Sequence, residues 1–206
     1  MREPENIRAV EQAGADWMGF ILWPHSSRWL GQVPSYLPEC PRVGVFVNPT
    51  DEEVQHWHGA LRLDYIQLHG DETPDRCRQI HDMAGVPIIK AIAVLQPSDL
   101  KQAEGFHLSD GVAYLLFDTK CPARGGSGSQ FDWSIVQLYH GELPFLLSGG
   151  IGPEDARRVC AVSHPLMAGV DLNSRFETAP GLKDWEALES FIQQIRRYEQ
   201  NQQDIC

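Results

Sequence analysis

The chain has 206 residues, enough for one hydrophobic core but few for two, so we expect a single domain over residues 1–206. No run approaches the roughly 18 consecutive apolar residues of a membrane helix, and the charged residues 1–6 do not resemble a secretory signal. The net charge of −11 disfavours nucleic-acid partners. The five cysteines lack the spacing of a zinc site or a disulfide scaffold. We therefore expect a cytoplasmic protein with reduced thiols, no metal, and neither membrane nor nucleic-acid partners.

Short apolar or β-branched runs alternate with amphipathic stretches along the chain, the pattern of βα units around a parallel sheet. The first expected element is a helix over Glu3 to Ala13. Several of the expected strands are almost continuously apolar, which suits strands that are buried on both faces. These strands are Trp17 to Leu22, Val43 to Asn48, Asp64 to His69, Pro87 to Val94, Ala113 to Asp118, Phe145 to Ser148 and Met167 to Leu172.

Start signals support the helices between these strands. Residues 50–53, Thr-Asp-Glu-Glu, form a capping box, in which the threonine hydroxyl and the second glutamate satisfy backbone donors at a helix start. Prolines at 74 and 153 stand where a first helical turn tolerates a missing N–H. The longest helix is expected over Asp184 to Tyr198. By contrast, a glycine and three prolines between Trp29 and Arg42 leave room only for a short or distorted helix.

The count of elements favours one fold class. Eight helices and seven strands are an odd total for an alternating fold, and a helix opens the chain with no strand ahead of it. One more N-terminal strand would complete a (β/α)₈ TIM barrel, so the expected fold is that barrel with its first strand missing from the sequence. An open, doubly wound sheet of seven strands stays possible on this count.

Four polar residues stand at or just after the carboxyl ends of expected strands, where parallel α/β folds place their active sites: Arg28, His69, Asp118 and Asp171. A helix cap or a loop hydrogen bond is the structural alternative for Asp118. The long loop that follows it has no apolar periodicity, which favours a functional role. For His69, a structural role with hydrogen bonds to its neighbours and a role in contacting substrate are equally favoured. Arg28, taken alone, favours neither a structural nor a functional role.

A phosphate site is predicted near the end of the chain. Gly149 and Gly150 follow an expected strand and precede an expected helix, so their backbone N–H groups could hold an anion. Glycine pairs alone are a weak signal. In a barrel, however, the loops after the seventh and eighth strands usually bind phosphate. With one strand missing at the start, the glycines follow strand seven, and Asn173 and Ser174 follow strand eight.

Ten short segments, taken in order, resemble phosphoribosylanthranilate isomerase along the whole chain. Each one is short, but their order and spacing together are specific to that family. They are GADWMGF at 14–20, PHSSR at 24–28, VGVFVN at 43–48, QLHG at 67–70, FDTK at 117–120, GGSG at 125–128, FDW at 131–133, LSGG at 147–150, DLNS at 171–174 and PGLKD at 180–184.

The resemblance implies an Amadori rearrangement of N-(5-phosphoribosyl)anthranilate to 1-(2-carboxyphenylamino)-1-deoxyribulose 5-phosphate, without metal or cofactor. It makes Asp118 the general acid and Arg28 the partner of the anthranilate carboxylate. His69 and Asp171 would line the pocket. Backbone at Gly149, Gly150, Asn173 and Ser174 would hold the phosphate. The only partner implied is the phosphorylated small-molecule substrate, and the oligomeric state stays open.

The family's general base is a cysteine in a first-strand motif of the form Lys-Ile/Val-Cys-Gly-Met. Residues 1–7 resemble the continuation of that motif, so Met1 would be its methionine and the cysteine would fall two residues upstream. None of the five cysteines present matches that residue. Cys121 lies near the expected site in sequence, but it stands in the loop after Asp118 and is not expected to be the base. Either the start was assigned at an internal methionine, or the chain is a truncated, inactive phosphosugar-binding barrel.

Two other phosphosugar barrels compete with this interpretation. Indole-glycerol phosphate synthase would be expected to show several lysine and glutamate residues at strand ends, and ribulose-phosphate epimerase would need histidine and aspartate metal ligands. Lys90 is the only clear strand lysine, and no ligand set of the second kind is apparent.

Overall fold

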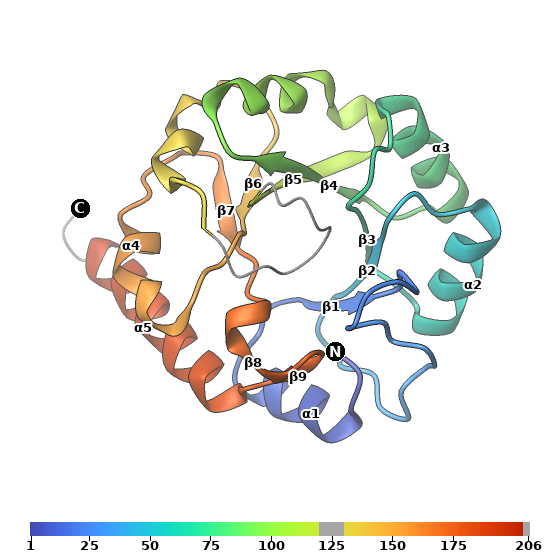
Figure 1. Cartoon of the computed structure of the whole chain (residues 1–206), viewed down its shortest axis with the longest axis horizontal. Helices are drawn as coiled ribbons and strands as arrows, with labels where there is room; N and C mark the ends of the chain where they lie inside the picture. Colours follow the sequence, from blue (N-terminus) through green and yellow to red (C-terminus); the bar gives the residue numbers. More distant parts are fainter. Residues whose placement is uncertain (120–129, 204–206) are drawn as a thin grey trace.

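The computed structural model describes residues 1–119 and 130–203, and a curled sheet of seven parallel strands forms its centre (Figure 1). The strands pair in the order in which they occur in the chain, from β1 to β7. Each expected strand is present, within about two residues of its predicted ends. The strands are β1 (Met18–Ile21), β2 (Arg42–Phe46), β3 (Tyr65–Leu68), β4 (Ile88–Val94), β5 (Val112–Thr119), β6 (Phe145–Leu147) and β7 (Met167–Val170).

Helices surround the sheet, as Figure 1 shows. The capping box at Thr50 is confirmed: its hydroxyl accepts the Glu53 N–H, and the Glu53 carboxylate accepts the Thr50 N–H. Thr73 caps the next helix through its hydroxyl alone, which accepts the Arg76 N–H. The α-helices are α1 (Pro4–Gln12), α2 (Asp51–Leu61), α3 (Pro74–Ala84), α4 (Ala156–Cys160) and α5 (Trp185–Gln203). Five 3₁₀ segments accompany them: Pro97–Gly105, Leu108–Asp110, Trp133–Leu138, Pro153–Asp155 and Ser174–Phe176.

One expectation about the connections was wrong. Residues 22–41, between β1 and β2, contain no helix, because one glycine and four prolines interrupt the segment. The short antiparallel hairpin β8 (Glu177–Ala179) and β9 (Leu182–Lys183) was not expected. Gly181 makes its tight turn possible with a φ of 80°.

Apolar side chains pack on both faces of the sheet. The larger cluster fills the layer between the sheet and the helices and includes Phe20, Phe46 and Phe117. A smaller cluster of Val43, Ile89, Ala91 and Leu116 lies on the opposite face of these strands, together with the rings of Trp17, Tyr65 and Tyr114. Trp17 stacks on Tyr65 with ring centroids 4.5 Å apart. These rings stand near the amino ends of β1, β3 and β5, so they close that end of the sheet's interior.

The two edges of the sheet are β1 and β7, and within the described part of the chain each pairs with one neighbour only. A cavity opens along both edges. It is lined there by Gly19 and Gly169 of the strands, by Val10 of α1, and by Phe191 and Ile192 of α5. The expectation of seven strands for the parallel sheet, with a helix ahead of the first of them, is confirmed for the described residues. Whether an eighth strand belongs in the gap stays a prediction.

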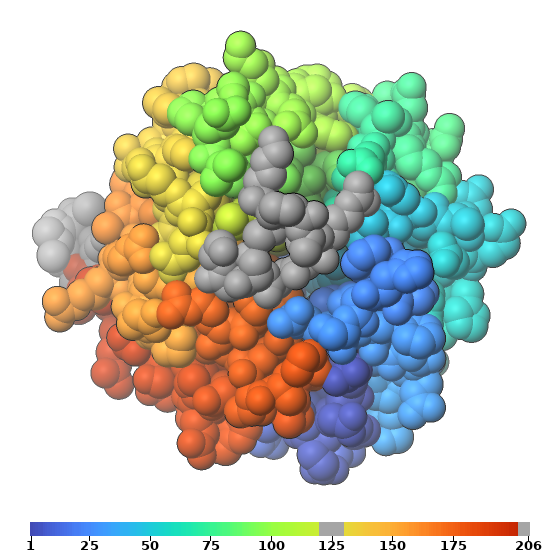
Figure 2. Space-filling view, viewed as in Figure 1, coloured from blue at the N-terminus to red at the C-terminus, as the bar shows by residue number. Residues whose placement is uncertain are grey.

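The hairpin and the N-terminal segment lie side by side, at the lower rim of the face seen in Figure 2. Asn6 and Lys183 exchange two hydrogen bonds: the Asn6 side-chain amide donates to the Lys183 carbonyl over 2.8 Å, and the Lys183 N–H donates to Asn6 Oδ1 over 2.7 Å. Arg2 also donates to the Pro180 carbonyl. Residues from the two ends of the chain therefore meet beside the carboxyl ends of the strands.

Candidate active site

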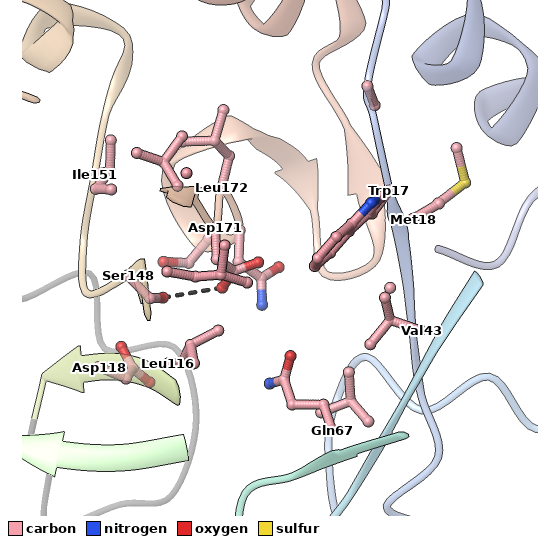
Figure 3. A pocket seen from close by; sticks show the side chains of 18 of the residues that line it. Trp17, Met18, Val43, Gln67, Leu116, Asp118, Ser148, Ile151, Asp171 and Leu172 are labelled. Atoms are coloured by element: carbon pink, nitrogen blue, oxygen red, sulfur yellow. Dashed lines mark hydrogen bonds between the residues drawn. The ribbon is translucent and has the colours of Figure 1, made fainter. Parts of the chain in front are cut away.

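All eight residues that the sequence nominated line one cavity of about 550 Å³. Asp118 and Asp171 are labelled in the close view of this cavity in Figure 3. The eight residues come from loops that are far apart in sequence, and the parallel sheet brings the ends of its strands together. The residues are Arg28, His69, Asp118, Gly149, Gly150, Asp171, Asn173 and Ser174. The cavity is therefore the candidate site for chemistry on a small molecule.

Asp118 lies near the end of β5, where two donors hold its carboxylate. The Thr119 N–H donates to Oδ1 over 2.8 Å, and His69 Nε2 lies 3.2 Å from Oδ2. Gln67 Nε2 lies 3.0 Å from the other ring nitrogen of His69. An amide nitrogen can only donate, so Nδ1 accepts and Nε2 carries the hydrogen that is donated to Asp118. Gln67 and His69 thus orient Asp118.

The Asp171 carboxyl follows β7 and receives a hydrogen bond from the Ser148 hydroxyl over 2.9 Å, drawn in Figure 3. Burial raises the pKa of Asp171, and the negative charge of Asp118 raises it further. The Ser148 hydrogen bond and the charge of Lys183 oppose this shift without cancelling it. Asp171 therefore keeps its proton at a higher pH than an ordinary aspartate does.

The loop after β6 has the shape expected of an anion cradle. Gly149 and Gly150 have φ values of 91° and 69°, in the left-handed region that other residues adopt at a cost. A Cβ on Gly149 would also lie 2.9 Å from the Thr119 backbone nitrogen. Gln130 braces the loop by donating to the Gly150 carbonyl over 2.9 Å. The helix expected to begin at Pro153 is only a 3₁₀ turn followed by the five-residue α4, so it contributes less to an anion site than predicted.

Arg28 lines the cavity, and an internal carboxylate already binds one edge of its guanidinium. Its Nε and Nη2 lie 2.8 and 2.7 Å from the same oxygen of Glu177, Oε2. The Glu177 side chain is only 4% exposed. Arg28 was expected to pair with a substrate carboxylate, and that role stays a prediction for the part of the guanidinium that Glu177 does not occupy. In the described part of the chain, Nη1 has no hydrogen-bond partner.

Comparison with known proteins assigns this site to a family. A profile described as N-(5'phosphoribosyl)anthranilate (PRA) isomerase matches residues 2–194. The chain is 51% identical over 199 residues to an N-(5'-phosphoribosyl)anthranilate isomerase of Phocaeicola vulgatus, across 96% of this chain and 95% of that protein. The chain belongs to the phosphoribosylanthranilate isomerase family. The isomerase of Parabacteroides distasonis is 44% identical over 202 residues, across 95% and 90% of the two chains.

Solved isomerase structures have the same fold. The Thermus thermophilus enzyme is 29% identical with a TM-score of 0.78, over 96% of this chain and 99% of that one. The Thermotoga maritima enzyme is 31% identical with a TM-score of 0.77, over 95% of both chains. A further isomerase structure, 28% identical with a TM-score of 0.72 over 95% and 98%, is a complex with reduced 1-(o-carboxyphenylamino)-1-deoxyribulose 5-phosphate. The expected TIM-barrel-like fold is thereby confirmed.

Sequence reasoning missed four polar residues that this isomerase-family site contains. Gln67 and Ser148 lie inside matched family segments but were not singled out, because amides and hydroxyls within apolar strands give no chemical signal of their own. Glu177 and Lys183 stand on the unexpected hairpin. Lys183 Nζ donates to the Asn173 carbonyl over 2.9 Å and to Asn173 Oδ1 over 2.7 Å, and it lies 3.4 Å from Glu177 Oε1.

The described cysteines, Cys40, Cys77 and Cys160, do not line the cavity. Burial raises the pKa of the Cys40 thiol to about 11 and that of the Cys77 thiol to about 12. A thiol acts as a base only as its thiolate, so neither is suited to proton abstraction near neutral pH. Cys121 lies outside the described residues.

Among the residues that the structure describes, no group of three or more histidine, cysteine or acidic side chains could hold a metal ion. No described helix is both long enough and apolar enough to cross a membrane.

Proposed function

We propose that this chain converts N-(5-phosphoribosyl)anthranilate to 1-(2-carboxyphenylamino)-1-deoxyribulose 5-phosphate, as a cytoplasmic isomerase of tryptophan biosynthesis. The observation that carries the proposal is the match of nearly the whole chain to isomerases of that name, at 51% and 44% identity. The gathering of all eight nominated residues around one cavity supports it. A related isomerase binds a reduced form of the same product.

Asp118 serves as the general acid. It donates a proton to the furanose ring oxygen, the C1–O bond breaks, and the anilino nitrogen supplies the electrons that make a C1=N iminium. A base then takes the C2 proton, and the electrons of that C–H bond form the double bond of an enolamine, which tautomerises to the amino ketone. The Nε2–H of His69, 3.2 Å from Oδ2, stabilises the carboxylate that Asp118 becomes.

Asp171 binds the sugar. Burial favours the protonated form of Asp171, and a protonated carboxyl can donate to a ribose hydroxyl, whereas an ionised carboxylate only accepts. The Ser148 hydroxyl fixes its orientation. Two carboxyls therefore face one substrate, Asp118 for the chemistry and Asp171 for binding.

The two anionic groups of the substrate bind to different groups of the cavity lining. Backbone at Gly149, Gly150, Asn173 and Ser174 holds the phosphate, which the left-handed conformation of the two glycines supports. The edge of Arg28 that Glu177 does not occupy binds the anthranilate carboxylate, because a planar guanidinium matches a carboxylate in shape.

The family resemblance implies a cysteine on a first strand as the base. Such a strand would fit in the gap between β1 and β7, because the cavity runs along both of these edges. Met1 lies beside that gap, with its amine 3.0 Å from the Gly19 carbonyl of β1.

Asp118→Asn tests the proposal, in a chain extended upstream by the Lys-Ile-Cys-Gly motif. Loss of a general acid should lower kcat by on the order of 10²–10⁴, while leaving the fold intact. Asp75→Asn is the matched control, since Asp75 is an exposed partner of Arg78 on α3. Turnover within tenfold of the parent would remove Asp118 from the acid role. Absence of turnover in the extended parent itself would overturn the proposed function.

A further inference from the structure

The hairpin residue Glu177 stands between two partly buried basic side chains, Arg28 and Lys183. Its Oε2 takes both hydrogen bonds from Arg28, at 2.8 Å from Nε and 2.7 Å from Nη2. Its other oxygen, Oε1, accepts the Gly181 N–H over 3.1 Å and lies 3.4 Å from Lys183 Nζ. The Glu177 side chain is 4% exposed and that of Lys183 is 9% exposed. Loop and hairpin, 149 residues apart in sequence, are thus joined through one carboxylate.

Glu177 is ionised beside its two basic partners. Burial opposes the ionisation of Glu177, but the hydrogen bond from Arg28 and the charges of Lys183 and Arg28 outweigh it, so the pKa of Glu177 lies below its usual value. Burial lowers the pKa of Lys183, and the charges of Glu177 and Asp171 oppose that shift without cancelling it. Arg28 stays protonated, so a carboxylate and a guanidinium face each other in this contact.

The geometry also determines which edge of the Arg28 guanidinium stays available to a substrate carboxylate. A guanidinium offers two edges to a carboxylate: Nε with one terminal nitrogen, or the two terminal nitrogens together. Glu177 occupies the Nε edge. The end edge, formed by Nη1 and the second hydrogen of Nη2, can still bind both oxygens of a carboxylate. Since the arginine side chain has several rotatable bonds, a fixed partner at one edge limits where the other edge points.

We propose that Glu177, with Lys183 behind it, is a positioning residue that holds Arg28 by its Nε edge and directs the end edge at the carboxylate on the substrate's aromatic ring. The inference rests on the proposed function, because it needs Arg28 to bind that carboxylate. The inference goes beyond the proposed function, because it assigns the selectivity for a carboxylated ring to a residue that contacts Arg28 and not the substrate.

A purely structural role for Glu177 is the alternative, in which Arg28 would only tie the loop to the hairpin. Other contacts already hold the hairpin: Asn6 and Lys183 exchange two hydrogen bonds, and Arg2 donates to Pro180. A structural tie would also affect every ligand of the site equally. The positioning role affects only ligands that carry the ring carboxylate.

The experiment compares two ligands by calorimetry, and it needs no turnover. One is reduced 1-(o-carboxyphenylamino)-1-deoxyribulose 5-phosphate, and the other is the same compound without the ring carboxylate. Glu177→Gln should raise the Kd for the carboxylated ligand roughly tenfold, as for a weakened charge-assisted hydrogen bond, and should leave the other within about twofold. In an Arg28→Ala background Glu177→Gln should add nothing, because its effect passes through Arg28. Glu5→Gln, an exposed change of equal charge, is the control.

Three results would overturn the inference: an unchanged Kd in Glu177→Gln, an equal loss for both ligands, or a tenfold loss that persists without Arg28. If Glu177→Gln does not fold, the same binding comparison is made with Glu177→Asp. This substitution keeps the negative charge but moves the carboxylate away from Arg28 by the length of one methylene. It should still lose affinity for the carboxylated ligand alone, and equal effects on both ligands would refute positioning. Failure of the parent chain to bind the carboxylated ligand would instead overturn the proposed function, whatever Glu177 does.

Discussion

Replacing Lys90 by methionine should destabilise the protein strongly, because it leaves a buried carboxylate without its counter-ion. Lys90 lies on β4, and its Nζ donates to Glu72 Oε2 over 2.9 Å and to the Gly70 carbonyl over 2.8 Å. The two side chains are 4% and 2% exposed. Removing one partner of such a pair costs about 3–5 kcal/mol. For a chain of this length that corresponds to a fall in Tm of roughly 6–20 °C.

Glu72 also organises the turn next to the active site. Its two oxygens accept the Asn48 N–H over 2.7 Å and the Gly70 N–H over 2.9 Å, so it joins the ends of β2 and β3 directly beside His69. The interaction energy between Lys90 and Glu72 is measured by thermal unfolding of Lys90→Met, Glu72→Met and the double variant. The double variant should lose much less stability than the sum of the single losses. A Lys90→Met protein within 2 °C of the parent, or strictly additive losses, would refute this account of the pair.

Three further predictions concern the cavity. Arg28→Ala in the extended chain should lower kcat/KM about 10- to 150-fold, from the loss of a bidentate charge-assisted contact, and an unchanged value would mean that another group binds the carboxylate. Asp171→Asn should raise Tm, because ionising a carboxyl of raised pKa destabilises the folded state. The gain in Tm should grow as the pH rises above the ordinary aspartate pKa of 3.8. An equal gain at every pH would contradict this. Extending the chain upstream of Met1 with Lys-Ile-Cys-Gly should raise Tm and give turnover, whereas Lys-Ile-Ala-Gly should raise Tm alone. Equal turnover of the unextended chain would show that the base is among the residues present.

The strands were predictable because they are buried on both faces, which makes them short apolar runs bounded by turn residues. The helix starts at Thr50 and Thr73 were predictable for a local reason, since a capping side chain bonds to backbone two or three residues away. The 22–41 connection was harder. Prolines show where a helix is interrupted, but the path of the chain between β1 and β2 depends on contacts with other elements, such as Glu11 accepting from the Tyr36 hydroxyl.

The strand ends predicted which residues gather around the cavity, because a parallel sheet must bring its carboxyl ends together. What these residues bond to could not be read from the sequence. The two interpretations of His69 turned out to be compatible, since it bonds to Gln67 and also lines the cavity beside Asp118. The partner of Arg28 lies on a hairpin 149 residues away, and no local pattern encodes such a contact.

The paired hydrogen bonds between Asn6 and Lys183 join positions 177 residues apart. Separating α1 from the hairpin breaks both bonds at once, so the first and last parts of the chain form one cooperative unit in local unfolding. The backbone amide of Lys183, which donates to Asn6, should exchange its hydrogen with solvent only when α1 detaches. One amide near the end of the sequence thus reports on the docking of the first helix.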